Sequence, residues 1–354
     1  MKKIGKEVCF LAAEGDNSRN GEGAFLTLRD GSILKIYTAY VSRDWHDHAT
    51  SVLAGMVSHD GGESFSATGV ALAPAPHAAN VMSVSLLRMQ NGDIGLFYLQ
   101  KIKKGDTVLD EYLLRRSQDE GKSWGEPTVC IPPTGYVVVN NDRVVRRADG
   151  RILIPFAHHG MGGSPGEVAV LFSDDDGVTW QESNRLCPPY SHDKAGLQEP
   201  GILEFPDGRL WLWMRTELGF QFEAFSEDGG RTFSGLRPNL FFTSPCAPMQ
   251  VKSVGKYTVA IFNPVAFSRP LANEGVYWHS WWGRTPLVCA VSDDGGASFA
   301  RCYYIEDDPR ENYCYPAILP REDGFLLGYY HSNGSPVCLN SLKIVKIDLD
   351  EIAE

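Results

Sequence analysis

Short runs of apolar and β-favouring residues alternate with turn sequences along the chain, and no stretch shows the period of an amphipathic helix. The pattern is clearest in residues 197–233, where three such runs, 201–205, 210–215 and 220–226, are separated by turns. Runs of this length, bounded by Pro, Asp and Gly, are typical of antiparallel strands. This stretch therefore predicts a three-stranded meander, with a tight turn at Asp207-Gly208 between the first two strands.

The meander places two charged residues at one end of the predicted sheet. Glu199 opens the first strand and Arg215 closes the second, so the turn brings the start of one strand beside the end of the next. The closing sequence SEDGGRTF, residues 226–233, follows the third strand and belongs to the opposite end. A carboxylate and a guanidinium are thus expected to share one rim.

The closing sequence is one of five copies of the pattern Ser-x-Asp-x-Gly-x-(Ser/Thr)-(Trp/Phe), spaced about sixty residues apart. The copies, here called Asp boxes, are SHDGGESF at 58–65, SQDEGKSW at 117–124, SDDDGVTW at 173–180, SEDGGRTF at 226–233 and SDDGGASF at 292–299. In such a turn the Asp accepts hydrogen bonds from turn amides, and the Gly supplies a positive φ. We interpret the Asp boxes as structural hairpin turns.

A second hairpin signal occurs six times between the boxes. Its turn glycines are Gly31, Gly92, Gly150, Gly208, Gly255 and Gly324. Six hairpins and five boxes predict an all-β fold, a six-bladed β-propeller of four-stranded antiparallel sheets. The last blade lacks a box, so we expect the apolar segment 341–347 to pair with a strand near Val8–Ala12 and close the ring. Because each blade needs its neighbours, residues 1–354 are expected to form a single domain.

Composition narrows the function classes. The formal net charge of −11 disfavours a nucleic-acid binder. No apolar run is long enough to cross a bilayer, and the one after the cationic N-terminus is short for a signal peptide, so we expect no membrane partner and a cytoplasmic protein. The eight cysteines include no CxxC pair, and we expect neither a metal ion nor a cofactor. A homo-oligomer stays open.

The rim opposite the boxes is the expected functional site, because a propeller has its central funnel there. Residues expected on this rim are Arg19, Glu22, Tyr37, Tyr40, Asp44, Asp47, His48, Asn80, Ser83, Tyr98, Gln100, Asn141, Asp142, Arg143, His158, His159, Gln198, Glu199, Arg215, Cys246, Arg284, Tyr313, Tyr315, Tyr330 and His331. The set is strongly polar for positions near a propeller axis. It indicates a polar ligand, and we expect a carbohydrate.

Five Asp boxes on a six-bladed propeller resemble the sialidase (neuraminidase) superfamily over nearly the whole chain. Three rim motifs add to the resemblance. They are Gln198-Glu199-Pro200 followed by Arg215, Gly283-Arg284-Thr285 before the fifth box, and Tyr313-Cys-Tyr-Pro-Ala-Ile before Asp323-Gly324. The family also has an Asp in the loop before the first box, for which Asp47 is the better aligned residue and Asp44 the alternative.

The resemblance implies a retaining exo-glycosidase that releases a terminal sialic acid or a related acidic sugar. Tyr313 would be the nucleophile, Glu199 would take its proton, and Asp47 would protonate the leaving oxygen. Arg215 and Arg284 would grip the carboxylate of the sugar, because guanidinium groups bind carboxylates in a fork geometry. Tyr315 is the alternative nucleophile, since residues two apart on a regular strand share a face.

The sequence departs from the family at the first strand. Sialidases usually supply a first clamp arginine there from an aromatic-Arg-Ile-Pro motif, but this chain has Gly21-Glu22-Gly23. Arg19, two residues upstream, is expected to reach the same site. Alternatively, Asp142 and Arg143 complete a different clamp for another acidic sugar. The tryptophans 278, 281 and 282 in the long segment 264–283 would then stack on a sugar or fill a core.

Two other functions stay open at this stage. A polysaccharide lyase acting on uronates also uses Tyr, Arg and His, and a carbohydrate-binding propeller needs no catalytic group. The combination of Glu199, Arg215, Arg284 and Tyr313 on one rim favours catalysis, because a lectin has no need of a paired Glu and Tyr.

Overall fold

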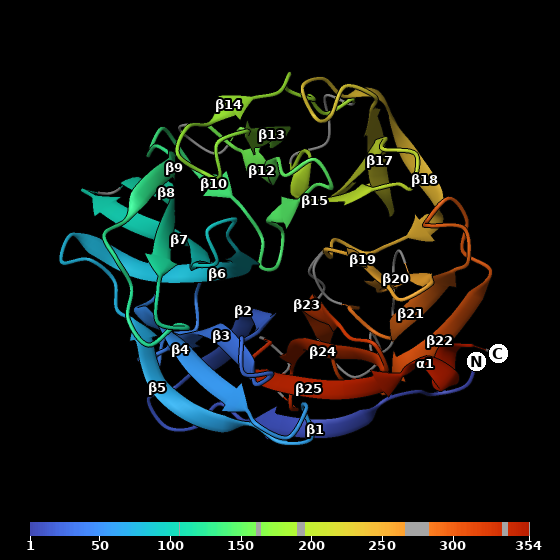
Figure 1. The fold of residues 1–354 in the computed structure, drawn as a ribbon, viewed down its shortest axis with the longest axis horizontal. Coiled ribbons are helices and arrows are strands. Elements are labelled where there is room, and N and C mark those ends of the chain that lie inside the picture. Colours follow the sequence, from blue (N-terminus) through green and yellow to red (C-terminus); the bar gives the residue numbers. More distant parts are fainter. Residues whose placement is uncertain (106, 161–163, 190–194, 266–282, 335–338, 354) are drawn as a thin grey trace.

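Six small antiparallel sheets form a ring in a computed structural model that describes residues 1–105, 107–160, 164–189, 195–265, 283–334 and 339–353 (Figure 1). This confirms the predicted all-β six-bladed propeller. Among the described residues the only helix is α1 (Leu349–Ile352), and no helix there has the length and apolar character needed to cross a membrane. The segment with the three tryptophans lies outside the described residues.

Each blade counts its strands outward from the axis. The first has β2 (Arg19–Thr27), β3 (Ile33–Tyr40), β4 (Ser51–Ser58) and β5 (Ser66–Leu72), and the second has β6 (Ala78–Arg88), β7 (Ile94–Lys104), β8 (Thr107–Ser117) and β9 (Thr128–Ile131). The third has β10 (Val137–Val138), β11 (Val145–Arg146), β12 (Ile152–His158), β13 (Glu167–Ser173) and β14 (Gln181–Glu182), and the fourth has β15 (Gln198–Glu204), β16 (Leu210–Arg215), β17 (Phe220–Ser226) and β18 (Ser234–Thr243). The fifth has β19 (Gln250–Val254), β20 (Tyr257–Phe262), β21 (Leu287–Ser292) and β22 (Arg301–Glu306), and the sixth has β23 (Tyr313–Pro320), β24 (Gly324–His331), β25 (Ser341–Asp348) and β1 (Lys6–Leu11).

Burial explains the apolar runs in the sequence. The middle strands β3, β20, β21 and β24 are buried along almost their whole length because each blade packs on a neighbour with both faces. The outer strands β5 and β18 expose most of their residues. The hydrophobic core is therefore divided into clusters between adjacent blades.

The ring closes through the N-terminus, as predicted. Strand β1 pairs antiparallel with β25 and completes the sixth blade, so the first and last parts of the chain share one sheet. Just before β1, the Ile4 amide donates to the Tyr304 carbonyl on β22 of the fifth blade (2.9 Å). The N-terminal segment thus links two blades.

The Asp boxes form the expected turns. In the fourth blade the Ser226 hydroxyl donates to Asp228 (2.8 Å) and accepts from the Gly230 amide (2.9 Å), while Asp228 also accepts from the Thr232 amide (2.9 Å) and hydroxyl (2.6 Å). The equivalent residues of the other four boxes make the same set of bonds. These aspartates are satisfied within their own turns, which supports a structural role.

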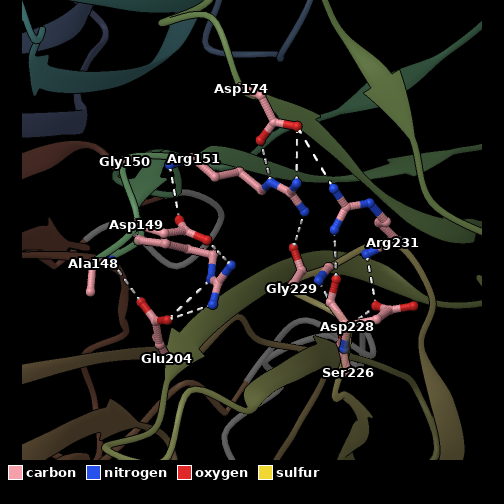
Figure 2. Close-up of polar contacts among 12 residues, drawn as sticks. Ala148, Asp149, Gly150, Arg151, Asp174, Glu204, Ser226, Asp228, Gly229 and Arg231 are labelled. Atoms are coloured by element: carbon pink, nitrogen blue, oxygen red, sulfur yellow. Dashed lines mark hydrogen bonds and ion pairs between the residues drawn. The ribbon is translucent and has the colours of Figure 1, made fainter.

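Arginines join the boxes to neighbouring blades. Figure 2 shows Arg151, at the start of β12, binding Asp174 of its own blade with two nitrogens (2.6 and 2.9 Å). A third nitrogen of Arg151 donates to the Gly229 carbonyl in the box of the fourth blade (2.8 Å). Beside it, Arg147 binds Glu204 of β15 (2.8 Å). These contacts hold the third and fourth blades together on the box rim.

Strand register separates this rim from the expected site. Gln198 at the start of β15 pairs with Arg215 at the end of β16, whereas Ser226 of the box pairs with Leu210 at the other end of β16. Five residues of strand lie between Leu210 and Arg215, which corresponds to about 17 Å. The box rim and the funnel rim are therefore opposite ends of the ring.

Candidate active site

A cavity of about 340 Å³ opens on the funnel rim, a size typical of small-molecule sites. It is lined by residues from blades on all sides of the axis, namely Arg19, Glu22, Trp45, Asp47, Met82, Ser83, Leu99, Lys101, Tyr136, Val137, Val138, Asn140, His159, Gln198, Glu199, Arg215, Arg284, Tyr315 and Leu339. Ten of the expected rim residues are among them. The ring architecture thus brings together side chains that are nearly 300 residues apart in sequence.

Irregularities in the innermost strands aim several of these side chains. Four of these strands shift register in the middle, and each shift holds one non-glycine residue with positive φ: Glu22 (49°), Ser83 (56°), Glu199 (43°) and Tyr315 (57°). Such β-bulges re-aim a side chain, and a positive φ at a non-glycine residue costs about 1–3 kcal/mol. All four residues line the cavity. The backbone therefore carries local strain at the positions that face the ligand space.

The centre of the site is a pair of side chains from the fourth and sixth blades. The Tyr315 hydroxyl donates to Glu199 Oε1 (2.9 Å), and Arg215 Nη1 donates to Glu199 Oε2 (2.6 Å). Burial, followed by the charge of Glu199, raises the pKa of the Tyr315 phenol well above its usual value. The phenol therefore keeps its proton in the free protein, with a carboxylate in contact to accept it.

The two expected clamp arginines converge beside this pair. Arg215 Nε donates to the Sγ atom of Cys246 (3.0 Å), and Arg284 Nη2 donates to the carbonyl of the same residue (2.9 Å). The Arg284 guanidinium also lies over the Tyr315 ring, 5.4 Å from its centroid. Both guanidinium groups are thus held at one wall of the cavity, where an anion would meet them.

Arg19 reaches the cavity from the first blade, but it is already paired. Its Nη1 donates to Asp47 (2.5 Å) and its Nη2 donates to Glu22 (3.0 Å). Glu22 in turn accepts from the Ser83 hydroxyl (3.0 Å). The alternative acid, Asp44, accepts from the backbone and ring of His46 (3.0 and 2.6 Å) and is not among the cavity-lining residues.

The structure contradicts the expected pairing of Tyr313 with Glu199. Tyr313 lies in the hydrophobic core between the fifth and sixth blades, with its ring against Tyr329 and His331. The reason is the bulge between Cys314 and Ala317, which breaks the alternation of β23 and puts Tyr313 and Tyr315 on different faces. Tyr315 occupies the position expected for Tyr313.

Asp142 and Arg143 do not line the cavity, so the alternative clamp built on them is wrong. Asp142 accepts from Lys252 Nζ (2.6 Å) and from the Ile318 amide (2.9 Å), and Arg143 Nη2 donates to the Met249 carbonyl (2.7 Å). These partners belong to the fifth and sixth blades. The segment 139–144, which interrupts the innermost strand of the third blade, therefore bonds across the axis and ties three blades together.

Lys101 is a cavity residue that sequence reasoning missed in favour of its neighbour Gln100. Its Nζ donates to Asp110 (3.1 Å) and lies 4.6 Å from the centroid of the Tyr136 ring. Gln100 instead bonds Glu111 (2.6 Å) away from the cavity. The available signal was a lysine near the end of an otherwise apolar strand, because a charge there needs a partner or a ligand.

Within the described part of the chain, no three His, Cys, Asp or Glu side chains gather in a way that would hold a metal ion. His159 lines the cavity, and its Nδ1 donates to the Ser164 carbonyl (3.2 Å). Burial lowers the pKa of His159, so its imidazole is neutral near pH 7. The site chemistry available from this chain is therefore that of Tyr, Glu, Asp and Arg side chains.

Comparison with known proteins agrees with this architecture. The sequence matches the family described as BNR repeat-like domain over residues 71–328. It is 26% identical to an anhydrosialidase from Macrobdella decora over 252 residues, which make up 66% of this chain and 31% of that protein. The chain thus spans less than a third of the length of this relative.

Two solved structures share the fold. A protein of unknown function from Dyadobacter fermentans is 18% identical, with a TM-score of 0.72, over 97% of this chain and 99% of that chain. An intramolecular trans-sialidase from Ruminococcus gnavus is 14% identical, with a TM-score of 0.72, over 97% of each chain. Since the family match covers well over half of the sequence, this protein belongs to the BNR repeat-like domain family and is a propeller of the sialidase superfamily.

Proposed function

We propose that this protein is a retaining exo-glycosidase that releases a terminal sialic acid or a related acidic sugar, with Tyr315 as the nucleophile. The observation that carries the proposal is the hydrogen bond from the Tyr315 hydroxyl to Glu199, beside two arginines that face the same cavity. A nucleophile in contact with its base and an anion clamp are the parts that this reaction needs. The printed names of the relatives, an anhydrosialidase and an intramolecular trans-sialidase, support this substrate class.

The chemistry follows from the charge of the substrate. A sialic acid carries a carboxylate on its anomeric carbon, so a carboxylate nucleophile would be repelled, whereas a neutral phenol would not. Arg215 and Arg284 would hold the sugar carboxylate. The Tyr315 oxygen would then bond to the anomeric carbon while its proton passes to Glu199 and the glycosidic C–O bond breaks. Water would release the sugar in a second step, and Glu199 would return the proton to Tyr315.

The test is turnover of a fluorogenic α-sialoside, compared with α-glycosides of neutral sugars and of uronic acids. We expect release from the sialoside with retention of the anomeric configuration, followed by NMR. Product analysis also separates transfer to water, which yields the free sugar, from intramolecular transfer, which yields an anhydro sugar. An unsaturated product absorbing in the ultraviolet would identify a lyase instead.

A fluorinated sialoside that traps the covalent intermediate tests the nucleophile itself. We expect peptide mapping to find the label on Tyr315. Labelling of a carboxylate would end the proposed mechanism, and labelling of Tyr313 would require a different arrangement of β23 from the one described above.

A further inference from the structure

The cavity contains two carboxylate–hydroxyl pairs of the same design. In each pair a glutamate on one bulge accepts from a hydroxyl on the bulge of another blade: Glu199 from Tyr315 at 2.9 Å, and Glu22 from Ser83 at 3.0 Å. In each pair an arginine occupies the other oxygen of the glutamate, Arg215 on Glu199 and Arg19 on Glu22. The proposed mechanism uses the first pair and leaves the second without a role.

Arg19 is shared between two carboxylates, Glu22 and Asp47. One guanidinium neutralises one of these anions, so the cluster favours one retained proton. Burial decides where that proton resides, because desolvation disfavours the charged form. The Glu22 side chain is 4% exposed, whereas that of Asp47 is 54% exposed. The proton therefore belongs on Glu22, while Asp47 remains an anion.

The titration of the two groups agrees with this geometry. Burial, only partly offset by Arg19, raises the pKa of Glu22 to about 7, and the charges of Asp47 and Glu199 act in the same direction. For Asp47, the ion pair and hydrogen bond with Arg19 outweigh burial and hold the pKa below its usual value. Two carboxyl groups with separated pKa values in one site are a sign of distinct acid and base roles. The other titratable groups packed against Arg19 are the phenols of Tyr40 and Tyr330.

We propose that Glu22 is the general acid and base of this site, and that Asp47 is a positioning residue that holds Arg19. This inference rests on the proposed function. It differs from the assignment by resemblance, in which Asp47 protonates the leaving oxygen. A carboxyl that keeps its proton near neutral pH is suited to donate it, whereas an ion-paired carboxylate is not.

The proton balance is complete in two steps. In the first, the Glu22 carboxyl gives its proton to the glycosidic oxygen as the C–O bond breaks, and Tyr315 bonds to the anomeric carbon as its own proton moves to Glu199. In the second, a water oxygen bonds to the anomeric carbon, a water proton goes to Glu22, and the bond to Tyr315 breaks. Glu199 then returns its proton to Tyr315, and both glutamates regain their initial states.

The kinetic test compares Glu22→Gln with Asp47→Asn on two sialosides that differ in their leaving group. On an alkyl or lactosyl sialoside, Glu22→Gln is expected to lower kcat/KM by about 10²–10⁴-fold, the usual contribution of general acid catalysis. On an aryl sialoside with an acidic phenol as leaving group, the loss in bond cleavage should be much smaller. Azide should restore turnover of Glu22→Gln and yield a glycosyl azide.

Asp47→Asn serves as the matched comparison. As a positioning variant it should lower kcat/KM by a similar factor on both sialosides, without azide rescue. The inference is overturned if leaving-group selectivity and azide rescue appear in Asp47→Asn and are missing in Glu22→Gln. Turnover with labelled Tyr315 but an indifferent Glu22→Gln would sink this inference alone, whereas no turnover of any sialoside would sink the proposed function.

A second measurement needs no turnover. Because the pKa of Glu22 is about 7 in the folded protein and about 4.3 in an unfolded chain, the folded state binds the extra proton and loses stability as pH rises between these values. Glu22→Gln removes this loss. The Tm of Glu22→Gln relative to the unmodified protein should therefore increase from pH 4.5 to pH 7.5 and then level off. A Tm difference that does not change with pH overturns the proton assignment.

Discussion

At the scale of single residues, Tyr313 and Tyr315 show how much one backbone irregularity decides. On a regular strand they would share a face, but the φ of 57° at Tyr315 turns its side chain into the cavity and leaves Tyr313 in the core. The strain at this position is repaid only if the orientation matters for function, because a regular strand would cost less. The two tyrosines are therefore a built-in pair of test and control.

Tyr315→Phe should reduce turnover to near background, because it removes the proposed nucleophile while Arg215 and Arg284 still bind the sugar carboxylate. Tyr313→Phe should retain most activity. The measurements are kcat on an aryl sialoside and the Kd of a sialic acid analogue. Loss of turnover in Tyr313→Phe with full activity in Tyr315→Phe would reverse the assignment.

Arg215→Ala and Arg284→Ala should each weaken binding of a carboxylate inhibitor by about 1.5–3 kcal/mol, the range for one hydrogen bond to a charged group. The corresponding neutral amide of the inhibitor should lose less. Arg209→Ala is the matched control, because Arg209 pairs with Asp207 on the exposed hairpin at the box rim. Unchanged inhibitor Kd values in both cavity variants, measured by calorimetry, would remove the clamp.

At the scale of elements, the innermost strands do two different jobs. Four of them use a bulge to present a side chain to the cavity, whereas in the third blade the strand is interrupted and Asp142, also at positive φ (59°), bonds to the neighbouring blades. Its partners Lys252 and the Ile318 amide have been brought from the fifth and sixth blades. The interrupted strand therefore stabilises the ring below the cavity.

Asp142→Ala should lower the free energy of unfolding by about 3–5 kcal/mol, the usual cost of leaving one member of a buried ion pair alone. Denaturant unfolding measures this loss. Asp293→Ala is the control, because that carboxylate is exposed and paired with Arg301 at the surface, where such pairs contribute about 0–1 kcal/mol. Equal stability of the two variants would contradict the structural role of Asp142.

At the scale of the whole molecule, the ring depends on its N-terminal segment. Strand β1 covers the edge of β25, and Ile4 before it is buried against the fifth blade. An uncovered edge strand is a template for aggregation, and a propeller blade is stable only between two neighbours. Closure therefore protects both the sixth blade and the cavity that Tyr315 lines. A cytoplasmic location, a single domain over residues 1–354 and a homo-oligomer remain predictions.

Deletion of residues 1–12 should abolish cooperative unfolding and cause association in size-exclusion chromatography, because the edge of β25 becomes free. A milder variant, Ile4→Ala, should keep the ring closed and cost about 2–5 kcal/mol, as expected for truncating a buried isoleucine. Thermal unfolding followed by circular dichroism tests both. A truncated chain that unfolds like the full chain would show that closure through β1 is dispensable.

What the sequence by itself determined is the architecture and the chemical kind of the site. The repeated boxes and hairpins depend on local turn chemistry and strand periodicity, which act within a few residues, and they correctly predicted six blades, closure through the N-terminus, and Glu199, Arg215, Arg284, Arg19 and Asp47 at the cavity. Only the tertiary structure decided between Tyr313 and Tyr315, placed Asp142 and Arg143 outside the cavity, and paired Glu22 with Arg19 and Ser83. The physical reason is that a bulge shifts side-chain alternation by one residue, and its strain is held by contacts between distant blades, which no local pattern records.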